Sequence, residues 1–422
     1  MKKYSSYKDS SVKWLGEIPS HWKVLHLRNL IRIFSEKGFP NAQLLSVTRE
    51  KGVILRNKDD KEENHNFVPD DLSGYKHLLP GDFIINKMKS WQGSYGVSPY
   101  EGIVSPAYYT CKLKGVDKDF FSKAIRSKAY IPFFSQFSKG IRVDQWDLDP
   151  SAMKNIPFVL PSIKEQRAIA SYISQITEHI DQAIAQQQKM IDLLNERKQI
   201  IIQKAVTKGL DPNVEMKDSG DEVIGRIPNQ WEIARFKNVA YVKANLVHPN
   251  LYLNFPQISP DNIEKNTGKL FGVKTVEECG IISDNHLFHK GQIIYSKIRP
   301  TLNKVTLAPY EGLCSADMYP IETTMNNKYL LYYMLSNSFV SQVSFYVMDR
   351  VKMPKINRDE LGQILVTIPP SAEQKKIVDF IESKLAVISN AVAKSFNITA
   401  LLQERKQIII NDVVTGKIKV SE

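Results

Sequence analysis

Side chains that can donate hydrogen bonds or stack gather in two short segments, each directly after an apolar run. The first segment follows the run FII and offers Asn86, Lys87, Lys89, Ser90, Trp91 and Gln92. The second follows the related run IIY and offers Ser296, Lys297, Arg299, Asn303 and Lys304. Base edges and phosphates of nucleic acid require donors on protruding loops. Both segments are therefore candidate DNA contacts.

A second pair of polar clusters lies further along the chain, upstream of two long segments without proline. The first of these clusters contains Lys139, Arg142, Asp144 and Gln145, and the second contains Arg350, Lys352 and Lys355. Each of these side chains, taken singly, is explained as well by solvation of a loop. The clusters as groups favour contact with a polyanion.

The chain contains none of the motifs that most often mark catalysis. It has no GxxxxGK[ST] phosphate loop, no dinucleotide-binding glycine fingerprint and no GxSxG elbow. His286 and His289 are three residues apart, but no third ligand has suitable spacing. We therefore predict neither a catalytic site nor a metal site. Trp14, Trp22 and Trp231 are interpreted as packing anchors in the core rather than as side chains that stack on bases.

The composition favours an acidic partner and a reducing compartment. The formal charge is +12 and the pI is near 9.2, and cationic side chains gain affinity for nucleic acid by releasing counterions. The three cysteines form no CxxC pair, which argues against a disulfide framework. The first residues lack the pattern of a signal peptide, and no uninterrupted apolar run approaches about 20 residues. We expect a soluble, cytoplasmic protein.

The segments that would position these clusters occur twice in the sequence. KDSSVKWLGEIPSHWKV, from Lys8 to Val24, returns as KDSGDEVIGRIPNQWEI, from Lys217 to Ile233. GDFIINKM returns as GQIIYSKI, PYEGIVSPAYY as PYEGLCSADMY, and LLNERKQIII as LLQERKQIII. The offset stays between 208 and 210 residues, so the chain is a tandem duplication. The strand-like frames match while the loop side chains differ, as expected if two similar scaffolds recognise different sequences.

Each half predicts an α+β globule followed by one long helix. Short apolar runs broken by Gly, Pro, Asn and Asp indicate strands and turns. Apolar residues then recur mostly every three, four or seven positions from Ser162 to about Lys208, and again from Ser371 to about Thr415. So narrow a stripe is typical of a coiled-coil seam, and the other copy is the obvious partner helix. Ser162 and Ser371 are the predicted N-caps.

These patterns divide the chain into four parts. We predict globular domains at 1–158 and 213–367, and long-helix regions at 159–212 and 368–422. The expected fold is two α+β domains joined by two helices that form an antiparallel coiled coil, with a pseudo-twofold internal repeat. Polar residues in the first turns of the helices are candidates for docking partner proteins, although capping and solvation explain them about as well: Glu165, Gln166, Arg167, Glu373, Gln374 and Lys375.

In these features the chain resembles the specificity subunits of type I restriction–modification systems. The opening KDSxxxWxGxIPxxW, the phrases LPSIKEQRAIASYI and PPSAEQKKIVDFI, and the order domain, helix, domain, helix carry the resemblance. The second opening module departs from it, with Val223 where the first copy has Trp14.

The resemblance implies a non-catalytic subunit in which each target recognition domain binds one half of a split site in double-stranded DNA. The helices would act as a spacer and dock two methyltransferase subunits, and restriction/translocase subunits could join them. S-adenosylmethionine, ATP and Mg would then belong to the partner subunits alone. Two alternatives stay open: the recognition subunit of another multisubunit restriction–methylation system, and a coiled-coil scaffold that binds proteins rather than DNA.

Overall fold

The computed structural model describes residues 2–57, 68–140, 146–350 and 352–420. The chain forms two compact units, and each long helix is shared between them. Unit 1 comprises Met1–Gln187 and Asn397–Glu422, and unit 2 comprises Gln188–Phe396. Each unit thus contains one globular part together with the ends of two helices.

A four-stranded antiparallel sheet, in the order β4-β11-β8-β9, is the largest sheet of unit 1. The strands described in unit 1 are β1 (Tyr7–Asp9), β2 (Glu17–Pro19), β3 (Lys23–His26), β4 (Ile31–Phe34), β5 (Leu45–Thr48), β6 (Gly52–Leu55), β7 (Lys76–Leu78), β8 (Phe83–Asn86), β9 (Tyr95–Val97), β10 (Gly102–Val104), β11 (Tyr108–Leu113), β12 (Ser138–Lys139), β13 (Asp147–Leu148) and β14 (Pro157–Leu160). Its shorter helices are α1 (Leu27–Leu30), η1 (Ser90–Gln92), α2 (Lys118–Ile125), α3 (Ile131–Gln136) and α4 (Pro150–Met153).

Unit 2 repeats this sheet with the order β18-β26-β23-β24. Its described strands are β15 (Met216–Asp218), β16 (Arg226–Pro228), β17 (Glu232–Arg235), β18 (Ala240–Val242), β19 (Leu246–Val247), β20 (Pro256–Ile258), β21 (Lys274–Thr275), β22 (Asn285–Phe288), β23 (Ile293–Ser296), β24 (Val305–Leu307), β25 (Gly312–Cys314), β26 (Met318–Thr323) and β27 (Leu365–Ile368). Its shorter helices are α6 (Phe236–Val239), η2 (Pro249–Leu251), η3 (Pro260–Asn262), α7 (Val276–Cys279), η4 (Pro300–Leu302), α8 (Asn327–Met334), α9 (Asn337–Val347) and α10 (Arg358–Gln363). The matching strand orders confirm the α+β duplication.

The units differ in the segment that lies between β4 and β8 in unit 1 and between β18 and β23 in unit 2. In unit 1 that segment forms the β5–β6 hairpin, with Thr48 opposite Gly52. In unit 2 it contributes to a five-stranded sheet in the order β19-β22-β25-β20-β21. The two halves therefore share the four-stranded sheet and differ in the segment attached to it, a hairpin in unit 1 and part of a five-stranded sheet in unit 2.

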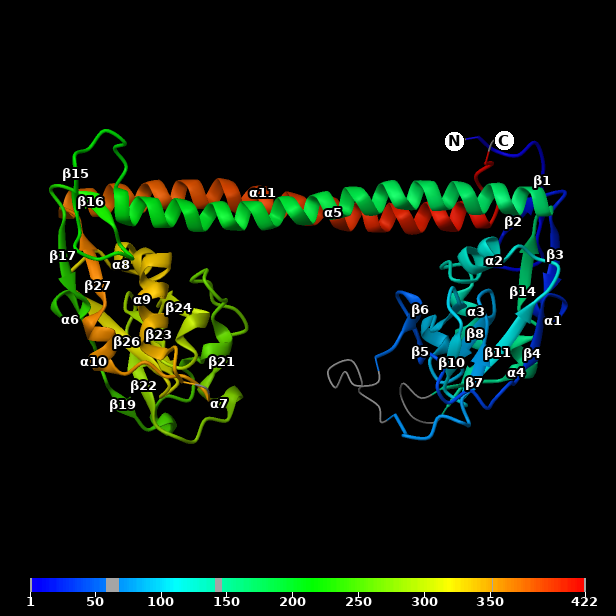
Figure 1. Cartoon of the computed structure of the whole chain (residues 1–422), viewed down its shortest axis with the longest axis horizontal. Coiled ribbons are helices and arrows are strands. Elements are labelled where there is room, and N and C mark those ends of the chain that lie inside the picture. The colour runs from blue at the N-terminus through cyan, green and yellow to red at the C-terminus, as the bar shows by residue number, and fades with distance from the viewer. Residues whose placement is uncertain (1, 58–67, 141–145, 351, 421–422) are drawn as a thin grey trace. The chain divides into compact units, whose positions relative to one another are not determined.

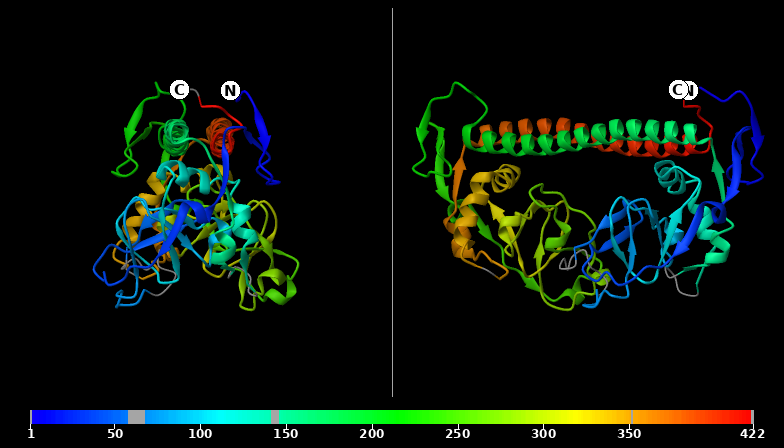
Figure 2. Two further views of the ribbon diagram at one scale, coloured as in Figure 1. Left: turned by 90° about the vertical axis from the view of Figure 1, so that its right-hand side faces the viewer. Right: turned by 45° about the vertical axis from the view of Figure 1, so that its right-hand side comes forward.

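The long helices are α5 (Ile163–Lys208) and α11 (Ser371–Val414). They lie side by side within each unit, as the views in Figure 1 and Figure 2 agree. In unit 1, Ile173 near the start of α5 shares a core cluster with Ile409 near the end of α11. In unit 2, Ile202 near the end of α5 clusters with Ile381 near the start of α11. The helices therefore run antiparallel, as predicted.

The two helices begin differently. Ser162 caps α5, because its hydroxyl accepts a hydrogen bond from the Glu165 N–H at 3.3 Å while Glu165 accepts one from the Ser162 N–H at 3.2 Å. The prediction of Ser371 as an N-cap was wrong. Ser371 already belongs to α11, and the Glu373 N–H donates to the Pro370 carbonyl at 2.8 Å.

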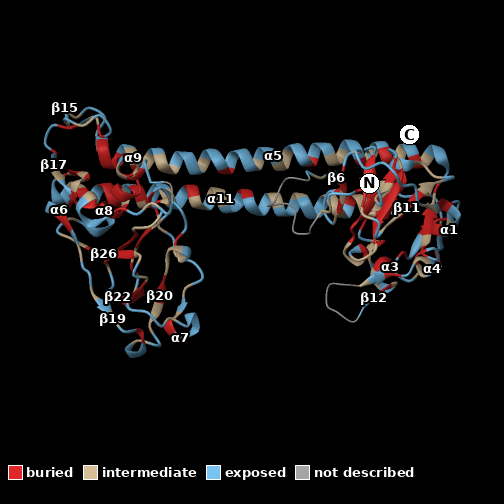
Figure 3. Cartoon of the chain, turned by 60° about the horizontal axis from the view of Figure 1, so that its bottom comes forward, coloured by how far each residue is buried: buried red, intermediate tan, exposed pale blue. Residues whose placement is uncertain are grey.

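Buried residues gather in the globular part of each unit, whereas the helices stay largely exposed (Figure 3). Trp22 and Trp231 are fully buried and anchor the opening module of each half, as predicted. Trp14 is 45% exposed, so its assignment to the core was wrong. It packs on Phe133 with ring centroids 4.8 Å apart.

One 18-residue stretch of α11 has a mean hydropathy of 1.4, so by length and composition this helix could cross a membrane. The ends of α11 nevertheless use apolar residues such as Ile381 and Ile409 to pack against α5. Because a helix with an apolar seam passes the same test, the stretch is only a weak sign of a membrane span.

Candidate DNA interface

In unit 1, the loop after β8, which holds the first predicted cluster, meets the segment around β13. The Leu148 N–H donates a hydrogen bond to the Lys87 carbonyl at 3.1 Å, and Lys87 pairs with Asp147 at 3.1 Å. The rings of Trp91 and Trp146 stack obliquely with centroids 4.9 Å apart. The loop after β8 and the segment around β13 therefore form one surface, although about 55 residues separate them in sequence.

In unit 2, the loop after β23 likewise contacts the segment before α10. The Arg299 N–H donates to the Pro354 carbonyl at 2.8 Å, and the Ile356 N–H donates to the Lys297 carbonyl at 3.0 Å. An isolated β-bridge joins Ile298 to Lys355. The loop after β23 and the segment before α10 are thus fixed to each other by backbone hydrogen bonds.

Four of the predicted contact residues lie inside the protein. Asn86, Ser90, Ser296 and Asn303 are all buried. Asn86 donates to the Tyr108 hydroxyl at 3.2 Å, and Asn303 donates to the Met334 carbonyl at 3.0 Å. The two serine hydroxyls donate to carbonyls of their own loops. These four side chains hold the loops in shape, so we remove them from the candidate interface.

Several candidate cations already have carboxylate partners. Lys355 and Lys297 face Asp317 at 3.1 and 3.8 Å. Lys304 lies 3.5 Å from Asp261, and Arg350 pairs with Glu360. Ion pairs with exposed partners contribute little stability. Their cations can therefore exchange a carboxylate for a phosphate, although part of their charge is neutralised.

Lys89 and Arg299 stand out because they occupy matching places, 210 residues apart, and are both exposed. Within the described ranges, neither side chain makes a hydrogen bond or an ion pair. Arg299 has a left-handed backbone with φ of 45°, a strained conformation for a residue other than glycine. It projects from a loop that backbone hydrogen bonds hold in place.

The other predicted contacts are more dispersed. Lys139 and Lys352 are exposed, and Trp91 and Gln92 are half-buried. Arg142 and Gln145, with Asp144, lie outside the described residues.

The β5–β6 hairpin of unit 1 was not among the predicted contacts. A groove of about 560 Å³ lies between this hairpin and the loop after β8. Arg49, Lys51 and Arg56 line it on the hairpin side, and Lys89 and Gln92 line it on the other. The signal was present, because REKG at 49–52 separates two short apolar runs, a pattern typical of a hairpin with a glycine in its turn.

Two of the predicted docking residues are structural. The Gln166 and Gln374 side chains are buried, and each accepts a hydrogen bond from a backbone N–H of the globular part, Asp117 at 2.8 Å and Asn326 at 2.9 Å. We withdraw both as docking residues, because their amides have no surface to present. Arg167 and Lys375, one residue further along, are exposed.

Glu165 and Glu373 are half-buried, and each forms a hydrogen bond with a tryptophan side chain of the protein. Each accepts a hydrogen bond from the indole N–H of its own unit, Trp22 at 3.3 Å and Trp231 at 3.0 Å. Glu165 also bonds His21 at 2.8 Å. Their position at the junction of helix and globule leaves little of either carboxylate for a partner protein.

The histidine pair of unit 2 is split between two environments. His286 is buried, and its burial, with Lys297 and Arg358 nearby, lowers the pKa of its imidazole. His289 lies on the surface beside Glu311. Across the part of the chain that the structure describes, no group of three or more His, Cys, Asp or Glu side chains could hold a metal ion.

A duplicated α+β scaffold, with exposed cations on matched loops and divergent segments beside them, defines a class of two-domain nucleic-acid recognition proteins. Comparison with known proteins agrees. The family model for the type I restriction modification DNA specificity domain matches residues 228–391. The type I restriction enzyme EcoDI specificity subunit of Escherichia coli is 34% identical over 410 residues, which cover 91% of this chain and 87% of that protein. The chain therefore belongs to the specificity subunits of type I restriction enzymes.

More distant relatives share the whole length. The MjaVIII specificity subunit of Methanocaldococcus jannaschii is 23% identical, with 98% of this chain and 97% of that protein covered. Two solved structures share the fold at low identity. One comes from a study of assembly and conformational transition in the type I R-M system, with a TM-score of 0.69, 14% identity and coverage of 95% and 99%. The other is the HsdS subunit from Thermoanaerobacter tengcongensis, with a TM-score of 0.52, 13% identity and coverage of 95% and 98%.

Proposed function

We propose that this chain is a non-catalytic subunit that recognises a two-part site in double-stranded DNA, one half with each globular part. The observation that carries the proposal is the pair Lys89 and Arg299. Both are exposed, each lies on the loop after the equivalent strand of its own four-stranded sheet (β8 or β23), and both lack an intramolecular partner within the described residues. Arginine binds guanine edges in the major groove through two hydrogen bonds, and lysine binds guanine or phosphate.

Divergence around this matched pair supports two different half-sites. The loop after β8 carries Trp91 and Gln92, whereas the equivalent loop after β23 carries Thr301 and Leu302. Unit 1 adds the basic β5–β6 hairpin, where unit 2 has a five-stranded sheet. Similar scaffolds with different donors and shapes are what recognition of two unlike sequences requires.

Family membership supports the proposed partners. We propose that two methyltransferase subunits dock on the long helices and that restriction/translocase subunits join them. S-adenosylmethionine, ATP and Mg would bind only to those partners, in the cytoplasm. Arg167 and Lys375 remain the docking candidates from the first helical turns, because both are exposed.

Selection from a pool of randomised duplex DNA tests the proposal on the full-length chain. We expect enrichment of two short, unlike sequences separated by a fixed gap. The logarithm of the dissociation constant should rise with the logarithm of salt concentration, with a slope of about 0.9 per phosphate contact. A chain that enriches no sequence and shows no salt slope would be a protein-binding scaffold instead. Methyl transfer by the isolated chain would overturn the non-catalytic assignment.

A further inference from the structure

Arg126, the C-cap residue of α2, forms hydrogen bonds to the β5–β6 turn. Its guanidinium donates hydrogen bonds to three backbone carbonyl oxygens: Tyr95 at 2.7 Å, Glu50 at 2.8 Å and Arg49 at 3.1 Å. Tyr95 belongs to β9 of the main sheet, whereas Arg49 and Glu50 belong to the turn. No carboxylate among the described residues pairs with this guanidinium. One side chain thus ties the turn to the scaffold.

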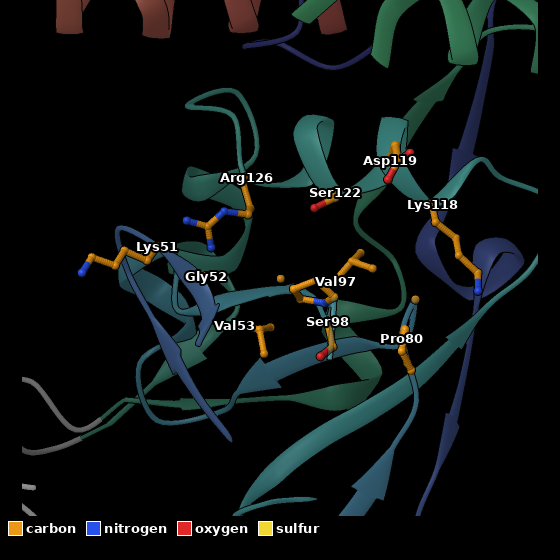
Figure 4. A pocket seen from close by; sticks show the side chains of 13 residues that line it. Lys51, Gly52, Val53, Pro80, Val97, Ser98, Lys118, Asp119, Ser122 and Arg126 are labelled. Atoms are coloured by element: carbon orange, nitrogen blue, oxygen red, sulfur yellow. The ribbon is translucent and has the colours of Figure 1, made fainter. Parts of the chain in front are cut away.

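The backbone opposite Arg126 leaves room for it. Gly52 has φ of 72°, and a Cβ atom there would lie 2.8 Å from Arg126 Nη1. Any other residue at this position would therefore be strained and would displace the guanidinium. Figure 4 shows the Arg126 side chain extending toward the strand that begins at Gly52, with Lys51 just beyond it at the edge of the pocket.

Apolar packing holds the hairpin only in part. Leu45, Val47 and Val53 belong to a small cluster that is separate from the main core of unit 1. The turn itself, Arg49 to Lys51, is exposed. Its position therefore depends strongly on the hydrogen bonds from Arg126, since a charged donor forms stronger hydrogen bonds than a neutral one.

At the equivalent place, unit 2 uses an apolar contact instead of hydrogen bonds. The C-cap residue of α8 is Leu335, which is 209 residues after Arg126 and buried. A Cβ atom on Gly268 would lie 3.5 Å from Leu335 Cδ1, so the loop at 264–269 packs on this leucine. The same helix end meets the variable segment in both units, through hydrogen bonds in one and apolar contact in the other.

We propose that Arg126 is a positioning residue for the first half-site, because it sets the β5–β6 turn and with it Lys51 against the DNA. The inference rests on the proposed function. It adds an element, the hairpin, and a residue that acts on DNA only through that element. Lys51 lines both the groove toward Lys89 and the pocket of about 480 Å³ in Figure 4 that Arg126 lines. A shift of the turn would move this cation relative to the backbone phosphates.

The test uses the full-length chain and the duplex that the wild-type chain selects. Arg126→Gln should weaken binding about tenfold, roughly the loss of one well-placed set of contacts. Its salt slope should fall by about one, because Lys51 no longer reaches its phosphate. Arg126→Lys should restore most of the affinity, since an ammonium group can still donate to the turn carbonyls. Lys128→Gln, an exposed change just beyond α2, is the matched control and should have no effect.

A double-mutant cycle separates positioning from general stability. Lys51→Ala alone should weaken binding about threefold and lower the salt slope by about one. In the Arg126→Gln background the same change should have little further effect, because coupled residues are not additive. Additive losses, or a folded Arg126→Gln chain with unchanged binding and salt slope, would overturn the inference.

Two further outcomes keep the test decisive. If Arg126→Gln does not fold, Gly52→Ala replaces it, because a Cβ atom there would displace the guanidinium, and an unchanged salt slope together with full additivity to Lys51→Ala would count against the inference. A wild-type chain that selects no DNA would instead refute the proposed function. Preference for the second half-site should stay unchanged in every variant, since Leu335 occupies the equivalent place in unit 2.

Discussion

The indole N–H of Trp231 donates a hydrogen bond to Glu373 Oε2 at 3.0 Å and thereby joins the opening module of unit 2 to the first turn of α11. Unit 1 repeats the bond between Trp22 and Glu165 at 3.3 Å. Beside each glutamate, a buried glutamine binds the globular part through a backbone N–H. The first turns of the helices, where partner docking was predicted, therefore fasten each globular part to its own helix.

The Glu165 carboxylate should make the stability of unit 1 depend on pH. Burial raises its pKa, but hydrogen bonds from His21, Ser162 and Trp22 outweigh burial and lower the pKa overall. A carboxyl group with a lowered folded-state pKa stabilises the fold above its unfolded pKa, about 4.3, and loses that contribution as the pH falls through the folded value. We expect Glu165→Gln to be less stable than wild type at neutral pH, with the difference shrinking below about pH 4.

Urea unfolding at a series of pH values measures this difference. Glu404→Gln, at an exposed position of α11, serves as the control and should show no such convergence. A Glu165→Gln deficit that persists unchanged into acid would mean that the carboxylate charge does not matter there.

Gln374→Leu should destabilise unit 2. The substitution removes the acceptor for the Asn326 N–H and the donor to the Pro369 carbonyl, at 2.9 Å each. A half-buried backbone group left without a partner costs about 1–3 kcal/mol. Urea unfolding followed by tryptophan fluorescence would measure the loss, with Gln403→Leu, on an exposed face of α11, as control. Equal stability of the two variants would contradict a fastening role for Gln374.

Arg299 and Lys297 should differ in what their loss does to DNA binding. Lys297 is partly neutralised by Asp317 and donates to the Ala316 carbonyl at 2.7 Å, whereas Arg299 is exposed. We expect Lys297→Ala to weaken binding slightly and uniformly. Arg299→Ala should reduce the binding free energy for DNA with the preferred base pair by about 1–3 kcal/mol. It should also relax the base preference at one position of one half-site.

Selection of each variant against randomised duplex DNA distinguishes these effects, with the other half-site as internal control. Uniform weakening by Arg299→Ala, with every base preference retained, would show that Arg299 contacts only phosphate.

A fragment from Met1 to about Pro212 should form a symmetric dimer. It contains α5 but lacks α11, so Ile169, Ile173 and Ile180 lose the partner residues that Ile409 and Val413 provide in unit 1. Exposure of apolar surface costs about 25 cal/mol per Å². A second fragment can supply a closely similar helix, and two identical antiparallel helices close as a twofold dimer.

Sedimentation and DNA selection together test this expectation. The dimer should prefer an interrupted palindrome of the first half-site. A well-folded monomer, or a dimer that still selects two unlike half-sites, would contradict the idea that the duplication generates the two-part recognition.

The sequence by itself determined the duplication, the α+β class and the long helices. These depend on local, periodic signals, because a stripe of isoleucine at helical spacing and a glycine-punctuated apolar run constrain the backbone wherever they occur. The burial of Trp22 and Trp231 could be predicted for the same reason, since large aromatic rings beside Ile-Pro rarely find another place.

Only the tertiary structure decided which polar side chains remain available. Asn86, Ser90, Ser296 and Asn303 have the composition of DNA contacts, yet strands and helices distant in sequence cover them. Gln166 and Gln374 resemble solvated helix residues, yet each bonds a loop about 49 residues away. Arg126 carried no local signal at all, because its three acceptors come from β9 and a turn about 76 residues earlier. Hydrogen-bond partners far apart in sequence are set by packing, and no pattern of spacing encodes them.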